Sequence, residues 1–188
     1  MRKIMMFNSV SLDGFFSDGN GDMSWAHSQD VEWQRFTNEN AAGEAEFLFG
    51  RKTWQMMASF WPTMQAMKTM PAVAKAMNET RKTVFSRTLS QPTWQNSTIA
   101  KGDLTTVVRR MKGESGPAIL VMGSGEIVAQ LTEARLIDEY QIVTVPVILG
   151  GGRSLFDGVS ERHGLDLTKS RTFANGNVVS WYRARSAS

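Results

Sequence analysis

The chain has 188 residues, a formal net charge of +3 and no cysteine. This length fits one domain, residues 1–188, with a substantial hydrophobic core. Without cysteine there can be no disulfides, thiolate nucleophiles or cysteine-based zinc sites, and the two histidines are too few for a multi-histidine centre, so we expect no bound metal. The small charge suits a binder of a small anion better than a nucleic-acid binder, whose basic residues form a denser stripe.

The sequence also bears on where in the cell the protein is found. No apolar run approaches the ~20 residues that a membrane span requires. Residues 1–3 lead into a strand-like segment without the small-residue cleavage site of a signal peptide. We therefore expect a cytoplasmic protein with no membrane segment.

Strands and helices alternate in the first half of the chain. Residues 3–12 are predicted as a central strand, and glycine-rich residues 13–22 as a mobile loop. A helix is expected to begin at Ser28 or Asp30 and to end near Asn40. A second strand at residues 46–49 and a helix at residues 51–57 follow. Residues 59–78 are predicted as a loop or lid with one short helix at 71–78, and their methionines either fill gaps in the core or form an adaptable binding surface.

The second half continues the alternation and ends in a hairpin. Strands are predicted at residues 82–86, 97–100, 118–122, 137–149, 165–173 and 177–185, and helices at residues 103–112, with Asp103 as the cap, and 126–131. The last two strands flank Asn175 and Gly176, the strongest short-range hairpin signal. This order predicts a three-layer α/β/α fold with a mostly parallel central sheet and a C-terminal antiparallel hairpin at one edge.

Three strand ends carry groups that suit a phosphorylated ligand. A strand that turns through glycine into a helix exposes backbone N–H groups at the helix start, where the helix dipole also favours an anion. Residues 50–53 and 123–127 follow this pattern, and Ser86 and Arg87 follow the third strand. Since ligands of open α/β sheets lie beyond the carboxyl ends of the strands, we expect these segments to share one site.

The ordered set of motifs resembles the dihydrofolate reductase superfamily. Residues 50–54 (Gly-Arg-Lys-Thr-Trp), 85–89 (Phe-Ser-Arg-Thr-Leu) and 121–126 (Val-Met-Gly-Ser-Gly-Glu) look like the three cofactor segments of dihydrofolate reductases, in the same order. Residues 11–14 (Ser-Leu-Asp-Gly) and 145–156 resemble the reductase domain of the riboflavin-biosynthesis deaminase-reductase. The fingerprint of ordinary Rossmann dehydrogenases, Gly-x-Gly-x-x-Gly near the first strand, is missing.

This resemblance implies a dihydrofolate reductase-like fold and an NADPH-dependent reductase that passes a hydride to a small heterocycle. The substrate would be of the 5-amino-6-(5-phosphoribosylamino)uracil type or a relative of it. Dihydrofolate or pterin reduction is one alternative, and a non-catalytic NADPH-binding module is another. A homodimer is also implied. Because the cysteine and histidine ligands of the zinc deaminase half are missing, we expect a free-standing reductase.

By the same resemblance, the cofactor site draws on four strand ends. The residues concerned are Val10, Ser11, Gly50, Arg51, Lys52, Thr53, Ser86, Arg87, Gly123, Ser124, Gly125, Glu126 and Ile127. The first two would lie beside the nicotinamide. The 50–53 and 86–87 segments would hold the adenosine 2′-phosphate side, and the 123–127 segment would hold the pyrophosphate. Residues 13–25 would form the flexible loop that covers the nicotinamide.

Two carboxylates are candidates for the catalytic acid. Asp30 lies near the start of the first helix, where dihydrofolate reductases carry the acid that orients the pterin, and its alternative role is a helix cap. Asp13 matches an acid near the substrate of riboflavin-type reductases, and its alternative role is a turn residue. The complete set of substrate-binding candidates is Asp13, Gly14, Trp25, Asp30 and Trp54. The two tryptophans either stack on a flat ring or belong to the core.

Overall fold

The computed structural model describes residues 1–28, 30–41 and 43–185. Their main feature is an eight-stranded sheet in the order β5-β4-β3-β6-β1-β7-β10-β9. The strands from β5 to β7 run parallel to one another, whereas β10 and β9 pair antiparallel. The strands are β1 (Ile4–Ser11), β3 (Ala45–Gly50), β4 (Lys82–Phe85), β5 (Ser97–Ala100), β6 (Ala118–Met122), β7 (Glu139–Val145), β9 (Leu165–Thr172) and β10 (Val178–Ala184).

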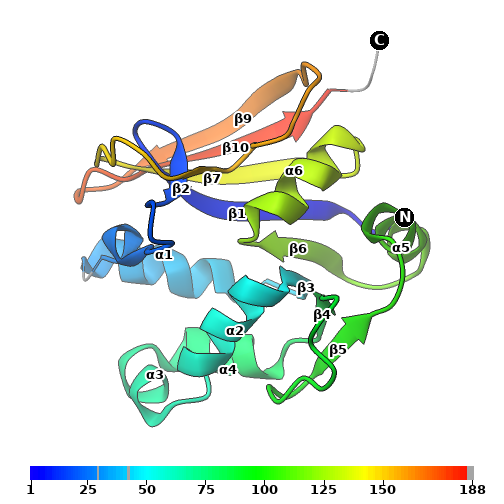
Figure 1. Ribbon diagram of the computed structural model, residues 1–188. Helices are drawn as coiled ribbons and strands as arrows, with labels where there is room; N and C mark the ends of the chain where they lie inside the picture. The colour runs from blue at the N-terminus through cyan, green and yellow to red at the C-terminus, as the bar shows by residue number, and fades with distance from the viewer. Residues whose placement is uncertain (29, 42, 186–188) are drawn as a thin grey trace.

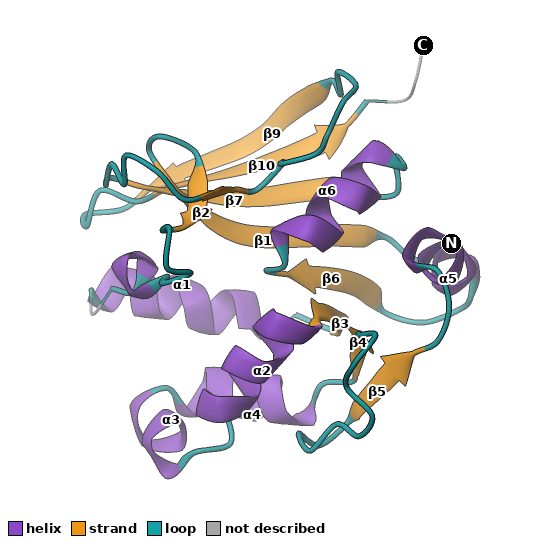
Figure 2. Ribbon diagram, viewed as in Figure 1, coloured by secondary structure: helices purple, strands orange, loops and turns teal. Residues whose placement is uncertain are grey.

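Helices cover both faces of this sheet. In the view of Figure 1, α5 and α6 lie in front of the strands, and α1 and α4 lie behind them; Figure 2 shows the same layers by element type. The helices are α1 (Val31–Ala41), α2 (Arg51–Phe60), α3 (Met64–Thr69), α4 (Pro71–Glu79), α5 (Leu104–Gly113) and α6 (Gly125–Glu133), with a 3-10 turn η1 (Ser24–Ala26). The predicted three-layer α/β/α fold, with its mostly parallel sheet, is confirmed.

The central strands are apolar throughout because both of their faces are buried. Side chains alternate along a strand, so Leu48 joins the core on the α5 and α6 side whereas its neighbour Phe49 packs with Val73 and Met77 of α4. A third cluster places Trp33 and Phe36 of α1 against β7 and β10, together with Phe173. Each such buried side chain stabilises the fold by about 1.5–3 kcal/mol relative to an exposed one.

Two local predictions are confirmed in detail. Asp103 caps α5, since its carboxylate accepts a hydrogen bond from the backbone N–H of Thr106 at 2.9 Å. The hairpin between β9 and β10 turns through Gly176, whose φ of +85° is the left-handed conformation that glycine adopts without strain. The Gly176 N–H donates to the Phe173 carbonyl at 2.9 Å and closes the turn.

Other predictions need correction. Residues 59–78 hold two short helices, α3 and α4, instead of one; Thr63 caps α3 by accepting from Ala66 N–H at 3.2 Å. The strand predicted at 137–149 ends at Val145, because Pro146 cannot donate to a ladder. A second, two-stranded sheet of β2 (Phe15–Ser17) and β8 (Arg153–Ser154) was not predicted. None of the helices within the described ranges is long and apolar enough to span a membrane.

Candidate functional site

The carboxyl ends of the parallel strands line up along one edge of the sheet. Ala100 of β5 lies beside Phe85 of β4, which lies beside Gly50 of β3. β6 continues the row on the other side of β3, so that Gly123 follows directly after it. Neighbouring strands are about 4.8 Å apart. The three predicted cofactor segments therefore lie next to one another, on one edge.

The strand order reverses between β6 and β1. The chain leaves β1 toward β3 through α1 on one face, and leaves β6 toward β7 through α6 on the other. Open α/β sheets bind ligands at such a point. β6 ends at Met122 opposite Phe7, whereas β1 continues to Ser11 along β7. The β6 side of β1 is thus free of strand pairing over residues 8–11.

Glycines bring the starts of α2 and α6 into contact. The Gly50 N–H donates to Ser124 Oγ at 3.1 Å, and that hydroxyl also lies 3.1 Å from Thr53 Oγ1. A Cβ on Gly50 would lie 2.1 Å from Ser124 Oγ, and one on Gly123 would lie 2.6 Å from Thr53 Cγ2. Gly123 and Ser124 both have left-handed backbones, with φ of +62° and +57°. The close approach of the two helix starts therefore requires glycine at positions 50 and 123.

The two helix starts that meet here lack side-chain caps. Gly50, before α2, has no side chain that could cap the helix. The Ser124 side chain, before α6, accepts no hydrogen bond from the first turn of its helix. Of the other helices, α3 and α5 are capped by Thr63 and Asp103, whereas α4 begins at Pro71 and also lacks a side-chain cap. The N–H groups of a helix start need acceptors, and the helix dipole makes an anion a favourable one. Two uncapped starts in contact are suited to an anionic ligand.

Cationic side chains follow three neighbouring strands of the same edge. Arg51 and Lys52 follow β3, Arg87 follows β4 and Lys101 follows β5. Among the described residues, none of these four has a carboxylate within ion-pair distance. The Arg51 guanidinium donates to Gln55 Oε1 at 2.9 Å. Sequence reasoning missed Lys101, although its place directly after a predicted strand was a usable signal.

The remaining cofactor candidates use their polar groups within the chain. Ser86 Oγ accepts from the N–H groups of the next turn, Thr88 at 3.1 Å and Leu89 at 2.8 Å. The Ile127 N–H donates to the Ser124 carbonyl at 2.9 Å, and its side chain belongs to the core. Glu126 is exposed in the first turn of α6. These residues shape the edge mainly through their backbone.

The end of β1 carries a buried polar side chain that sequence reasoning missed. Asn8 is 4% exposed, and its Nδ2 donates to Met6 Sδ at 3.5 Å. The signal for it was an amide side chain within a strand that was predicted to be central. Val10 is half-buried against the core. Ser11 is 1% exposed, and its hydroxyl donates to Asp13 Oδ1 at 2.6 Å and accepts from Phe15 N–H at 3.0 Å.

Both candidate acids accept hydrogen bonds from the chain itself. Asp13 accepts from Ser11 Oγ and from the backbone N–H groups of Leu149 at 3.1 Å and Gly150 at 2.8 Å. The bond from Ser11 and the backbone donors lower the pKa of the Asp13 carboxyl below its usual value. Asp30 Oδ1 accepts from Trp33 N–H at 2.8 Å, which is the contact of a helix N-cap.

The other three substrate candidates differ in their surroundings. Gly14 lies in a turn with φ of +88° and open space around it. The Trp25 ring packs against the α1 cluster, and its Nε1 donates to the Asp22 carbonyl at 3.1 Å. Trp54 is 3% exposed in the core and its Nε1 donates to Ser97 Oγ at 2.9 Å, so we assign it to packing.

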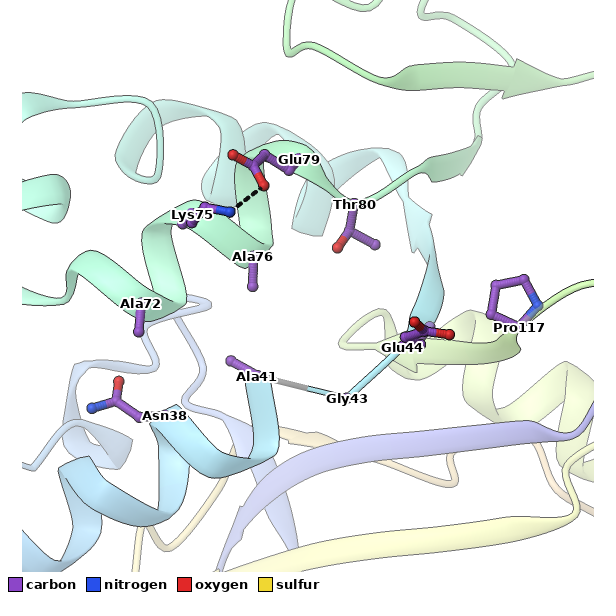
Figure 3. A pocket seen from close by; sticks show the side chains of 11 residues that line it. Asn38, Ala41, Gly43, Glu44, Ala72, Lys75, Ala76, Glu79, Thr80 and Pro117 are labelled. Atoms are coloured by element: carbon purple, nitrogen blue, oxygen red, sulfur yellow. Dashed lines mark hydrogen bonds and ion pairs between the residues drawn. The ribbon is translucent and has the colours of Figure 1, made fainter.

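Two hollows lie at the opposite, amino edge of the sheet. One, of about 570 Å³, lies between α1, α4 and the start of β3, where Lys75 pairs with Glu79 (Figure 3). The other, of about 520 Å³, lies beside residues 1–3 and the start of β7. Neither contains any predicted site residue. No group of three or more histidine, aspartate or glutamate side chains within the described ranges could hold a metal.

Comparisons with known proteins bear on the fold and the family of this chain. YyaP of Bacillus subtilis (strain 168) is 30% identical over 179 residues, 94% of this chain and 92% of that protein. A candidate riboflavin biosynthesis protein from Shewanella sp. PV-4 superposes with a TM-score of 0.76 at 22% identity, over 98% of this chain and 99% of that one.

Part of a longer enzyme has the same fold as this chain. It is the diaminohydroxyphosphoribosylaminopyrimidine deaminase/5-amino-6-(5-phosphoribosylamino)uracil reductase of Thermotoga maritima, with a TM-score of 0.66 and 15% identity, over 98% of this chain and 57% of that one. The model of the RibD C-terminal domain family matches residues 2–179. This chain therefore belongs to the RibD C-terminal domain family, a family of reductase type.

Proposed function

We propose that this protein is an NADPH-dependent reductase that transfers a hydride to a small heterocycle, of the 5-amino-6-(5-phosphoribosylamino)uracil type or a relative of it. The observation that carries the proposal is the contact between the uncapped starts of α2 and α6, beside unpaired cations at the ends of β3, β4 and β5. A dinucleotide that carries a pyrophosphate and a separate 2′-phosphate matches this distribution of donors and charge. Members of the family generally use a nicotinamide cofactor.

Different residues of the carboxyl edge would bind different parts of the cofactor. The 123–127 segment would hold the pyrophosphate through the backbone N–H groups at the start of α6, ahead of Ile127, whose own N–H donates to the Ser124 carbonyl. Arg51 and Arg87 would bind the 2′-phosphate with forked, charge-assisted bonds, and Lys101 would add charge. The free side of β1 at Val10 and Ser11 would take the nicotinamide.

NADPH would supply the hydride when bound, and the chain would position the acceptor and exclude water. The loop of residues 13–25 borders the end of β1, and its closure would shield the reacting atoms. The negative charge that develops on the substrate has to be met by a proton. Asp13 and Asp30 both accept bonds from the chain, so we assign this proton to a single water molecule retained in the closed site.

The second candidate function is an NADPH-binding module without catalysis. The observation that favours it is the same pair of carboxylates: Asp30 caps α1 and Asp13 binds three donors of its own chain. Dihydrofolate or pterin reduction is a third option, which differs from the first only in the substrate.

One experiment separates these options. NADPH fluorescence is titrated with the protein, and oxidation at 340 nm is then followed with a ribosylaminopyrimidine, a dihydropterin and a quinone. We expect micromolar binding and turnover with the ribosylaminopyrimidine. Binding without any turnover would support the module, turnover with the dihydropterin alone would support the pterin option, and no binding at millimolar NADPH would reject all three.

We also propose that the protein acts in the cytoplasm as a homodimer. Strand β9 is an edge strand whose residues are largely exposed, Leu167 to 58%, and edge strands of this kind readily pair with a second chain. Light scattering at micromolar concentration should give twice the mass of one chain, and cell fractionation should find the protein with the cytoplasmic enzymes. A monomer mass would contradict the dimer.

A further inference from the structure

Two loops at the end of β1 and β7 form one unit. We call them the double loop, residues 12–17 and 146–154. The Leu12 N–H donates to the Val147 carbonyl at 2.8 Å, and β2 pairs with β8. Gly152 packs so closely that a Cβ on it would lie 2.1 Å from the Ser17 carbonyl oxygen. The two loops therefore contact each other backbone to backbone.

The double loop also contacts the candidate cofactor site at two places. At one end it continues directly from Ser11 of β1. At the other, the Phe16 ring lies against the start of α6, where a Cβ on Gly125 would be only 2.6 Å from a ring carbon. Both Ser11 and Gly125 belong to the predicted cofactor set. A shift of the double loop would thus move the walls of that site.

The Asp13 carboxylate holds the double loop together. Its Oδ1 accepts from Ser11 Oγ and from Leu149 N–H, and its Oδ2 accepts from Gly150 N–H, so one side chain joins both loops and the end of β1. The Ser11 hydroxyl extends this network to the Phe15 N–H. Hydrogen bonds to an ionised acceptor are stronger than neutral ones, so the charge of Asp13 contributes to the hold.

These contacts argue against Asp13 as a proton donor. A general acid must carry its proton at the working pH. The three donors around Asp13 favour the ionised carboxylate and lower its pKa, with the Ser11 hydroxyl as the largest cause. An ionised carboxylate is an acceptor only.

We propose that Asp13 is a positioning residue: it fixes the double loop against β1 and α6, and thereby holds Ser11 and Phe16 where the cofactor is bound. The inference rests on the proposed NADPH-dependent function, and it gives Asp13 no contact with the substrate.

The test compares the wild type with Asp13→Asn, which keeps the shape of the side chain and removes its charge. Asp166→Asn is the matched control, an exposed carboxylate at the opposite edge that binds Arg185. Two quantities are measured, the hydrogen exchange of the Phe15, Leu149 and Gly150 amides without cofactor and the NADPH dissociation constant. For Asp13→Asn we expect exchange about tenfold faster and a dissociation constant about fivefold higher. Asp166→Asn should change neither.

Saturating NADPH should slow these amides again in Asp13→Asn, because coupling between the cofactor and the double loop is reciprocal. A merely structural carboxylate would lower the unfolding midpoint and leave the dissociation constant at the wild-type value, which would overturn the inference. Should Asp13→Asn not fold, Ser11→Ala removes the two bonds of the Ser11 hydroxyl, and the Leu149 and Gly150 amides should then exchange faster by a smaller factor. A wild type that does not bind NADPH ends the proposed function instead.

Discussion

The two edges of the central sheet use their polar groups in opposite ways. At the amino edge, Arg2 and Glu46 form a buried ion pair at 2.7 Å, and Lys112 pairs with Asp138 at 2.6 Å. At the carboxyl edge, Arg51 and Arg87 have no carboxylate partner within the part of the chain that the structure describes, and two helix starts lack side-chain caps. The amino edge satisfies its charges internally and contributes stability. The carboxyl edge leaves its cations without carboxylate partners and two helix starts without side-chain caps, which suits a site for an anionic ligand.

The positions of the two surface hollows do not match this contrast between the edges. The amino edge carries both of the hollows described above, yet its Arg2 and Lys112 already have carboxylate partners. The carboxyl edge is marked instead by cations without carboxylate partners, by uncapped helix starts and by close glycine contacts. We therefore base the proposed site on the chemistry of the carboxyl edge and not on these hollows.

Breaking the buried pair of the amino edge should have the largest effect. Glu46 accepts from Arg2 at 2.7 Å and from Thr83 Oγ1 at 2.8 Å. Glu46→Ala leaves a buried guanidinium without its partner, which should cost about 3–5 kcal/mol in urea unfolding. Glu79→Ala, which breaks the exposed pair with Lys75, should cost less than about 0.5 kcal/mol. Equal costs would refute the contrast between buried and exposed pairs.

Lys82, at the amino edge, should make the unfolding free energy of the protein depend on pH. Its Nζ is bound by the carbonyls of Asn78, Thr80 and Gln95 without a carboxylate, and burial lowers its pKa to about 8. Between pH 8 and 10 the unfolded chain binds more protons at this lysine than the folded one, so stability rises with pH. We expect the difference in unfolding free energy between wild type and Lys82→Met to rise by roughly 2–3 kcal/mol over this window. A difference that is flat with pH would contradict the lowered pKa.

A change at the glycine contact of the carboxyl edge should affect both stability and binding. Gly123→Ala places a Cβ 2.6 Å from Thr53 Cγ2 at a left-handed backbone, and should cost about 1–3 kcal/mol. NADPH affinity should fall with it, since the start of α6 has to move. Gly151→Ala is the control, because a Cβ there meets open space. If calorimetry and fluorescence titration find the two variants alike, the contact is unimportant.

The cations of the carboxyl edge should affect only the choice of cofactor. The double variant Arg51→Ala with Arg87→Ala removes charge-assisted bonds to the 2′-phosphate, and should weaken NADPH binding about tenfold while NADH binding stays within about twofold. Arg109→Ala on the exposed face of α5 is the matched control. An equal loss for both cofactors would place the 2′-phosphate elsewhere.

Local sequence signals predicted most of the large elements. Apolar runs and caps such as Asp103 lie within one element, so nearest neighbours in sequence suffice to find them. The small sheet of β2 and β8 was missed because its strands are short and pair across residues 15 to 154. The bonds from Leu149 and Gly150 to Asp13 also cross more than a hundred residues, and no local pattern encodes them.

The sequence located the segments of the candidate site more readily than the orientation of single side chains. Glycine followed by cations marks residues 50–53, and these lie at the expected edge. Trp54 belongs to the same motif, yet its ring packs into the core, where Ser97 on β5 accepts its N–H. Which side of a helix faces the core depends on the strands beneath it, and that information lies elsewhere in the chain.

The central claim is that the carboxyl edge, and not the amino edge with its hollows, binds NADPH. Backbone amide resonances followed during an NADPH titration test it directly. The account predicts saturable shifts at residues 50–53, 86–88, 101 and 123–127, and none at residues 38–45 or 72–80. Shifts confined to the amino edge, or none at millimolar NADPH, would contradict it.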